Sequence, residues 1–145
     1  MNIHRIHGVR VNALACAVPK NEFALTEYAP NLVDEKTARQ IENISGFKSL
    51  RIAPENITTS DLFCKAAGTL SHEINNITAL VFVTKTPDYV SPATSHILQD
   101  RLKLPHEILC LDVNEGCSGF ITGLYVASLI AAQTGQSVLL GGGDT

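Results

Sequence analysis

Three short apolar runs constrain the fold of this 145-residue chain more than any other feature. They cover residues 79–83 (ALVFV), 108–113 (ILCLDV) and 137–140 (SVLL). Each has the length of a strand, and a run that is apolar on both sides of its alternation is typical of a strand buried on both faces of a parallel sheet. Helical patterns separate the runs, at 94–102, where Thr94 is placed to cap the helix, and at 118–134 with Gly135 after it. This alternation predicts an α/β layered fold with a largely parallel sheet.

The region before these runs predicts smaller elements. Residues 8–18 alternate between small apolar and other residues, which indicates a strand that ends at Pro19. Asp34 is placed to cap a helix that has Ala38, Ile41 and Ile44 on its inner face and Gly46 after its last turn. We expect a loop or a short ribbon over 47–59, and a further helix that is capped by Ser60 or Asp61.

Charge and composition exclude two classes of partner. The net charge is −3, and the 11 Lys and Arg residues are scattered, so we expect no nucleic acid to bind. No apolar stretch approaches the ~20 residues of a membrane span, and the first residues do not read as a signal peptide. Only 17% of the residues are charged, against about 25% in an ordinary domain, so we expect a second domain or subunit to cover part of the surface.

The cysteines are Cys16, Cys64, Cys110 and Cys117. They form no CxxC pair and have no histidine at zinc spacing, so the sequence predicts no metal site. We expect the first three to pack as small buried hydrophobes. Unpaired thiols without a signal peptide are most simply reduced and cytoplasmic.

Cys117 differs because it stands between a predicted buried strand and a long helix, in the run DVNEGCSGF (112–120). Gly116, Ser118 and Gly119 permit a tight strand-to-helix turn that projects one side chain, as in the nucleophile elbow. The first turn of a helix presents unpaired N–H groups and a positive dipole end, which favour a thiolate and could bind an oxyanion. The sequence therefore predicts a nucleophile. The alternative is that Cys117 packs where only a small residue fits.

A catalytic base is not evident in this sequence. The histidines are His4, His7, His72, His96 and His106, and none has a local catalytic signature. We expect them to occupy surface or packing positions. The chain thus offers a nucleophile without an obvious base.

Several linked motifs resemble one family. DVNEGCSGF is similar to the active-site motif of the beta-ketoacyl-ACP synthase III enzymes, which are thiolase-fold condensing enzymes. Residues 45–53 (SGFKSLRIA), 81–102 (VFVTKTPDYVSPATSHILQDRL) and 137–145 (SVLLGGGDT) resemble further segments of that family in the same order. The resemblance covers nearly the whole chain.

The resemblance implies a thiolase-like layered fold in which residues 1–145 form the amino-terminal half, one βαβαβαβ unit with a mostly parallel sheet. It implies that Cys117 takes an acyl group from acyl-CoA and condenses it with malonyl on acyl carrier protein, without a metal or redox cofactor. The His and Asn of such enzymes lie in a second half, whose HQAN-like and GN-like motifs are not found in this sequence. We expect a homodimer, or pairing with a carboxy-terminal half, and no condensation by this chain alone.

Two departures and two alternatives accompany the resemblance. Gln40 and Ile44 stand where many members have a CoA-stacking Trp and a basic residue, and Glu115 and Gly116 replace a commoner small pair. One alternative function is a non-catalytic acyl-binding or assembly half of a split enzyme. A cysteine hydrolase of unrelated fold is the other, and it would need a local base.

Overall fold

The structure is a computed structural model, and it describes residues 5–28, 34–74 and 76–145. The chain divides into two compact units. The larger unit consists of Met1–Ala17 together with Thr58–Thr145, and the smaller unit is Val18–Ile57. The larger unit contains α3 (Thr59–Gly68), β3 (Ile77–Val83), α4 (Thr94–Arg101), β4 (Leu109–Val113), α5 (Gly119–Thr134) and β5 (Ser137–Gly142). The smaller contains β1 (Glu22–Ala24), α1 (Leu25–Tyr28), α2 (Glu35–Ser45) and β2 (Ser49–Arg51).

A parallel three-stranded sheet in the order β4-β3-β5 forms the centre of the larger unit. All residues of β3 except Thr78 are buried, which confirms the prediction of a strand covered on both faces. Leu80 and Phe82 belong to the main hydrophobic cluster, together with Leu98 of α4 and Leu139 of β5. Phe63 of α3 meets Phe82 edge-on, with the ring centroids 5.1 Å apart.

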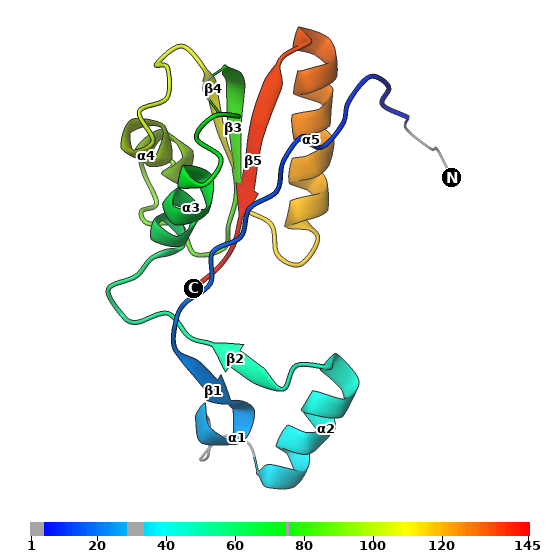
Figure 1. Cartoon of the computed structure of the whole chain (residues 1–145), viewed down its shortest axis with the longest axis vertical. Helices are drawn as coiled ribbons and strands as arrows, with labels where there is room; N and C mark the ends of the chain where they lie inside the picture. Colours follow the sequence, from blue (N-terminus) through cyan, green and yellow to red (C-terminus); the bar gives the residue numbers. More distant parts are fainter. Residues whose placement is uncertain (1–4, 29–33, 75) are drawn as a thin grey trace. The chain divides into compact units, whose positions relative to one another are not determined.

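The helices of this unit lie on opposite faces of the sheet. Figure 1 shows α3 and α4 on one face and α5 on the other. The reason is topological. The connection through α4 runs from β3 to its neighbour β4, whereas the connection through α5 runs in the opposite direction along the sheet, from β4 past β3 to β5. Right-handed parallel crossovers in opposite directions along a sheet must use opposite faces.

Glycines allow α5 to pack very closely on the sheet. A Cβ on Gly123 would lie 2.5 Å from Val83 Cγ2, and a Cβ on Gly119 would lie 2.8 Å from Val83 Cγ1. Both distances are shorter than real Cβ contacts allow, so a side chain at either position would push the helix away from β3. Because the first turn of α5 follows Cys117, this approach also fixes where Cys117 lies.

The opposite side of α5 is exposed. Its large apolar side chains Phe120, Ile121, Leu124, Tyr125 and Leu129 are all open to solvent. In β4, an edge strand of this sheet, Leu109 and Leu111 are also exposed. Contiguous exposed apolar surface of this kind marks an interaction site. No helix in the described part of the chain is long and apolar enough to cross a membrane.

The smaller unit is held by a short ribbon and a capped helix. Strands β1 and β2 pair antiparallel, and Arg51 Nη2 lies 2.6 Å from Glu22 Oε2 across them. The Asp34 carboxylate accepts the backbone N–H of Thr37 at 2.8 Å, and Gly46 ends α2 with a φ of 77°. Both ends of this helix and the short ribbon are as predicted.

Six local predictions are wrong. The run 108–113 was predicted as a buried strand, but it forms β4 at the edge of the sheet, where none of its residues is buried and Leu109 and Leu111 are exposed. Residues 8–18 form no strand, because no strand of the described chain pairs with them and a strand exists only through a ladder. Only Ala38 is buried on α2, whereas Ile41 and Ile44 are exposed. Cys16 is also exposed and does not pack in the core. The caps of two helices differ from those predicted as well: α3 begins after Thr58, which makes a capping box with Asp61, and the side chain of Thr94 does not cap α4.

We predict opposite effects of alanine at the two helical glycines Gly123 and Gly68. Gly123→Ala should lower the free energy of unfolding by about 1–3 kcal/mol, because the new methyl group overlaps Val83. Gly68→Ala is the control, since it also replaces a helical glycine and nothing lies within 4 Å of the position that its Cβ would occupy. It should be neutral or stabilising by up to about 1 kcal/mol. Urea denaturation measures both, and equal stability of the two variants would contradict the packing described here.

Candidate active site

Cys117 lies in the connection between β4 and α5, and its side chain is exposed. The turn around it is closed by the Gly119 N–H, which donates to the Gly116 carbonyl oxygen at 2.8 Å. The Ser118 carbonyl then accepts the N–H groups of Ile121 and Thr122, which starts the helix. Cys117 therefore lies directly before the N-cap residue Ser118 of α5, in the position of a nucleophile on a strand-to-helix elbow.

Glu115 braces this turn from the side. Its Oε2 accepts the hydroxyl of Thr122 at 2.6 Å, which ties the start of the turn to the second turn of α5. Its Cβ lies 3.0 Å from the position that a Cβ on Gly119 would occupy. A side chain at Gly119 would therefore displace both Glu115 and Val83, and the small residue that the sequence predicted for the turn is required there.

The position in the sheet favours a ligand site. Strands β3 and β4 are neighbours, with Val83 opposite Val113, and the Thr84 N–H donates to the Val113 carbonyl at 3.2 Å. Beyond this point the chain leaves β3 toward α4 on one face and leaves β4 toward α5 on the other (Figure 1). Such a reversal is a topological switch point, and α/β proteins bind ligands outside the carboxyl ends of the strands there. Cys117 stands four residues after the end of β4, at this edge.

Carboxylates hold the segment that follows β3. Asp144, just beyond β5, accepts the Lys85 N–H at 2.6 Å and the Thr84 hydroxyl at 3.0 Å. Asp112 of β4 accepts the N–H groups of Thr94 and Ser95 at 2.7 and 2.8 Å and so caps α4 from outside the helix. Both carboxylates satisfy N–H groups that would otherwise lack a partner at the edge of the sheet.

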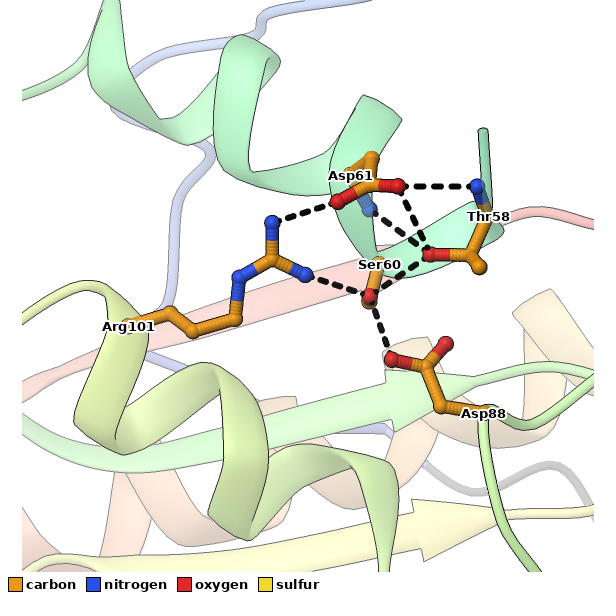
Figure 2. Close-up of polar contacts among 5 residues, drawn as sticks. All are labelled: Thr58, Ser60, Asp61, Asp88 and Arg101. Carbon is orange, nitrogen blue, oxygen red and sulfur yellow. Dashed lines mark hydrogen bonds and ion pairs between the residues drawn. The ribbon is translucent and has the colours of Figure 1, made fainter. Parts of the chain in front are cut away.

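A third polar group joins α3, α4 and the loop over residues 86–92. Figure 2 shows Arg101 of α4 reaching both Ser60 and Asp61 of α3, at 2.7 and 2.5 Å. Ser60 in turn donates to Asp88 Oδ2 at 2.6 Å, and Thr58 lies 2.9 Å from the Ser60 oxygen. We call these five residues the Ser60 network. Ser60 is fully buried, so the network is an internal tie between segments distant in sequence.

The network changes the ionisation of its members. Hydrogen bonds from the Thr58 backbone and the Arg101 guanidinium lower the pKa of Asp61. The same Asp61 carboxylate raises the pKa of Arg101.

Burial raises the pKa of the Cys64 and Cys110 thiols, which keeps these half-buried cysteines protonated and unreactive.

Comparison with known proteins adds relatives and solved structures of similar fold. No family model matches the chain. A putative 3-oxoacyl-[acyl-carrier-protein] synthase 3 of Campylobacter jejuni is 30% identical over 97% of this chain, and a beta-ketoacyl-[acyl-carrier-protein] synthase III of Natranaerobius thermophilus is 34% identical over 95%. A crystal structure of a 3-oxoacyl-(acyl-carrier protein) synthase of Burkholderia xenovorans superposes with a TM-score of 0.74 at 30% identity, over 87% of this chain and 38% of that one.

The chain is a relative of the beta-ketoacyl-ACP synthase III family. The resemblance to the amino-terminal part of these proteins is confirmed, and so is the thiolase-like fold. The chain spans about two fifths of the curated relatives, 42% of the Campylobacter protein and 43% of the Natranaerobius protein.

In the part of the chain that it describes, the structure does not place a catalytic base beside the predicted nucleophile. No hydrogen bond or ion pair among the described residues joins Cys117 to a histidine, and His4 lies outside the described residues. The described residues contain no group of three or more His, Cys, Asp or Glu side chains that could hold a metal ion. Cys117 therefore remains the one predicted site residue, as a nucleophile candidate.

The carboxylates around the site had a weaker sequence signal. Asp112 orients backbone, because its carboxylate accepts the N–H groups of Thr94 and Ser95. Asp88 and Asp144 were not singled out, although a carboxylate beside a buried strand or in a two-proline loop requires a donor once it is enclosed. The sequence therefore indicates that these carboxylates need hydrogen-bond donors. It does not identify the donors, because they lie on other segments of the chain.

Removing the external cap of α4 should destabilise the chain. Asp112→Asn leaves one oxygen for two N–H donors, and we expect the free energy of unfolding to fall by about 1–3 kcal/mol. Asp100→Asn is the control, since Asp100 is exposed and only weakly paired with Lys103. Chemical denaturation at pH 7 measures both, and a loss in Asp112→Asn no larger than in the control would contradict the capping role.

Asp61 should make stability depend on pH in the acid range. Its pKa is lower in the folded chain than its ordinary value, so its contribution is complete above that ordinary value and disappears as pH falls through the folded pKa. We expect the parent to exceed Asp61→Asn in stability at pH 7 and to approach it below about pH 4. Denaturant titrations of both proteins across this range test the sign. A difference that grows on acidification would refute it.

Proposed function

We propose that the chain supplies the acyl-accepting part of a 3-oxoacyl-ACP synthase III enzyme, with Cys117 as the nucleophile. The observation that carries the proposal is the position of Cys117, exposed in a glycine-lined elbow at the switch point of the sheet. The relatives at 30–34% identity support the same reading.

The first step is a transfer of the acyl group between two sulfur atoms. The Cys117 thiolate attacks the carbonyl carbon of acyl-CoA, the new carbon–sulfur bond forms, and the bond to the CoA sulfur breaks. CoA leaves as a thiolate and takes up the proton released by Cys117. Backbone N–H groups at the start of α5 would stabilise the oxyanion formed in between. The chemistry uses two thioester substrates and includes no metal or redox cofactor.

The second step joins carbon atoms and requires more than these residues. Malonyl carried on acyl carrier protein would lose carbon dioxide, and the resulting carbanion would attack the carbonyl carbon of the acyl group on Cys117. The new carbon–carbon bond would form, the bond to the Cys117 sulfur would break, and Cys117 would leave as a thiolate while the 3-oxoacyl group stays on the carrier protein. By the resemblance, the His and Asn that assist this step belong to a second half. We propose that residues 1–145 act as the amino-terminal half, and that the exposed apolar side of α5 packs against the second half. Homodimer formation is part of the same proposal.

The non-catalytic alternative shares this surface. An acyl-binding or assembly half would need the exposed side of α5 but would not need a reactive Cys117. Acylation of Cys117 therefore separates the two functions.

The free cysteines fit a reducing compartment, and the proposal includes a cytoplasmic location.

The deciding experiment is intact-mass analysis of the chain after incubation with acetyl-CoA and longer acyl-CoA thioesters. We expect one acyl adduct on the parent and none on Cys117→Ala. Cys16→Ala is the matched control, because Cys16 is the other exposed thiol and its loss should leave the adduct intact. An adduct that persists in Cys117→Ala would eliminate Cys117 as the acceptor. We further expect no condensation product with malonyl-ACP from this chain alone.

A further inference from the structure

Glu115 is the charged residue nearest to Cys117 in the sequence, and the helix that follows it carries no charge. Between Glu115 and Asp144 the chain contains no Asp, Glu, Lys or Arg, so the elbow beyond Glu115 and all of α5 are uncharged. The ion pairs among the described residues join other side chains and leave Glu115 without a salt bridge. The elbow therefore has one local negative charge, which no ion-paired cation neutralises.

The Glu115 side chain is held in place rather than free in solvent. Its Oε2 accepts the hydroxyl of Thr122 at 2.6 Å, and its Cβ lies 3.0 Å from the position that a Cβ on Gly119 would occupy. The Gly119 N–H closes the turn onto the Gly116 carbonyl, and Cys117 lies inside that turn. Glu115 therefore contacts the residue that closes the turn and the second turn of α5, which fixes its charge at the start of the helix.

Chain geometry keeps this charge close to the thiol. Consecutive Cα atoms are about 3.8 Å apart, so the Cα atoms of Glu115 and Cys117 lie within about 7.6 Å of each other. This separation is no greater than the Debye length of about 8 Å at physiological ionic strength. Two unit charges about 7 Å apart in water alter a rate roughly threefold. A charge on a group attached to Cys117 is therefore close enough to be affected by Glu115.

We propose that Glu115 is a specificity-determining residue that disfavours acyl groups bearing a carboxylate and so restricts Cys117 to uncharged acyl groups. An acyl group on Cys117 is bonded to the sulfur itself, and one methylene group separates the carboxylate of malonyl from its thioester carbonyl. The proposal rests on the function proposed above for its acyl donors. Its electrostatic part, that Glu115 sets the charge preference of Cys117, does not depend on acyl transfer.

Two methanethiosulfonate reagents of opposite charge test the electrostatic part without any enzymatic step. The Cys117 sulfur attacks the reagent, a disulfide forms to a trimethylammonioethyl or a sulfonatoethyl group, and methanesulfinate leaves. Rates are followed on the Cys117 peptide by mass spectrometry in a Cys16→Ala background, because Cys16 is the other exposed thiol. We expect the ratio of the cationic to the anionic rate to fall about ninefold in Glu115→Gln, the product of two threefold effects.

Salt provides a readout that a purely structural role of Glu115 would not change. At an ionic strength of about 1 M the Debye length falls to about 3 Å, which is shorter than the separation of the two residues. The ratio of the parent should then approach that of Glu115→Gln. A parent ratio that does not move toward the variant in high salt would contradict an electrostatic effect.

Matched variants separate the charge from the contact that holds it. Glu115→Gln keeps an oxygen that accepts the Thr122 hydroxyl, so it removes the charge alone. Thr122→Val removes the contact but keeps the charge, and its ratio should stay closer to the parent than to Glu115→Gln. Glu107→Gln removes the same charge from an exposed position before β4, and the five residues of this strand span about 13–16 Å between it and the elbow. Its ratio should equal that of the parent.

Propionyl-CoA and malonyl-CoA extend the test to acyl donors. The two acyl groups have the same number of carbon atoms, and a carboxylate in one replaces the methyl group of the other. The charges of CoA are common to both donors and cancel in the ratio of their rates. By intact mass we expect the parent to accept propionyl faster than malonyl, and Glu115→Gln to reduce this preference roughly threefold.

Unchanged methanethiosulfonate ratios in Glu115→Gln would overturn the proposal, and so would an equal fall in Glu107→Gln or Thr122→Val. If the parent takes no acyl group from either CoA thioester, the proposed function fails, while the methanethiosulfonate ratios still decide whether Glu115 sets the charge preference of Cys117. If the parent is acylated but Glu115→Gln leaves the preference for propionyl unchanged, Cys117 remains the acceptor and the selection against carboxylates is refuted.

Discussion

The burial of β3 on both faces is the constraint on which the larger unit depends. A central parallel strand can be covered on both faces only if crossovers pass over each side of the sheet, and α4 and α5 do this in opposite directions. The same requirement creates the switch point between β3 and β4. The place of the candidate site is therefore a consequence of how the core is covered.

Close helix–sheet packing and hydrogen bonds to carboxylates then fix the positions of the segments at the carboxyl edge of the sheet. Gly119 and Gly123 bring α5 onto Val83, which sets the position of the Cys117 turn. Carboxylates from three separate segments hold the chain after β3: Asp112 caps α4, Asp144 holds residues 84–86, and Asp88 joins the Ser60 network. These contacts order the carboxyl edge of the sheet, where β4 leads into the turn that bears Cys117.

The predictions succeeded where local sequence and burial agree. The run 79–83, the helix that ends at Gly135 and the cap at Asp34 each have a periodic or stereochemical signal that few other structures satisfy. They failed where an element depends on a partner. Residues 8–18 alternate correctly but have no strand beside them, and Ile44 continues the helical period of α2 without a surface to bury it.

The sequence by itself determined the α/β class, the family resemblance and Cys117 as the candidate nucleophile, because strand periodicity, glycine spacing and a motif around one thiol are properties of neighbouring residues. The tertiary structure alone decided that the loop after β3, the cap of α4 and the Ser60 network meet at the edge that bears Cys117. Hydrogen bonds between residues 28 and 41 positions apart, such as Ser60 to Asp88 and Arg101 to Ser60, leave no periodic trace in a sequence. They exist only once the sheet has brought their elements together.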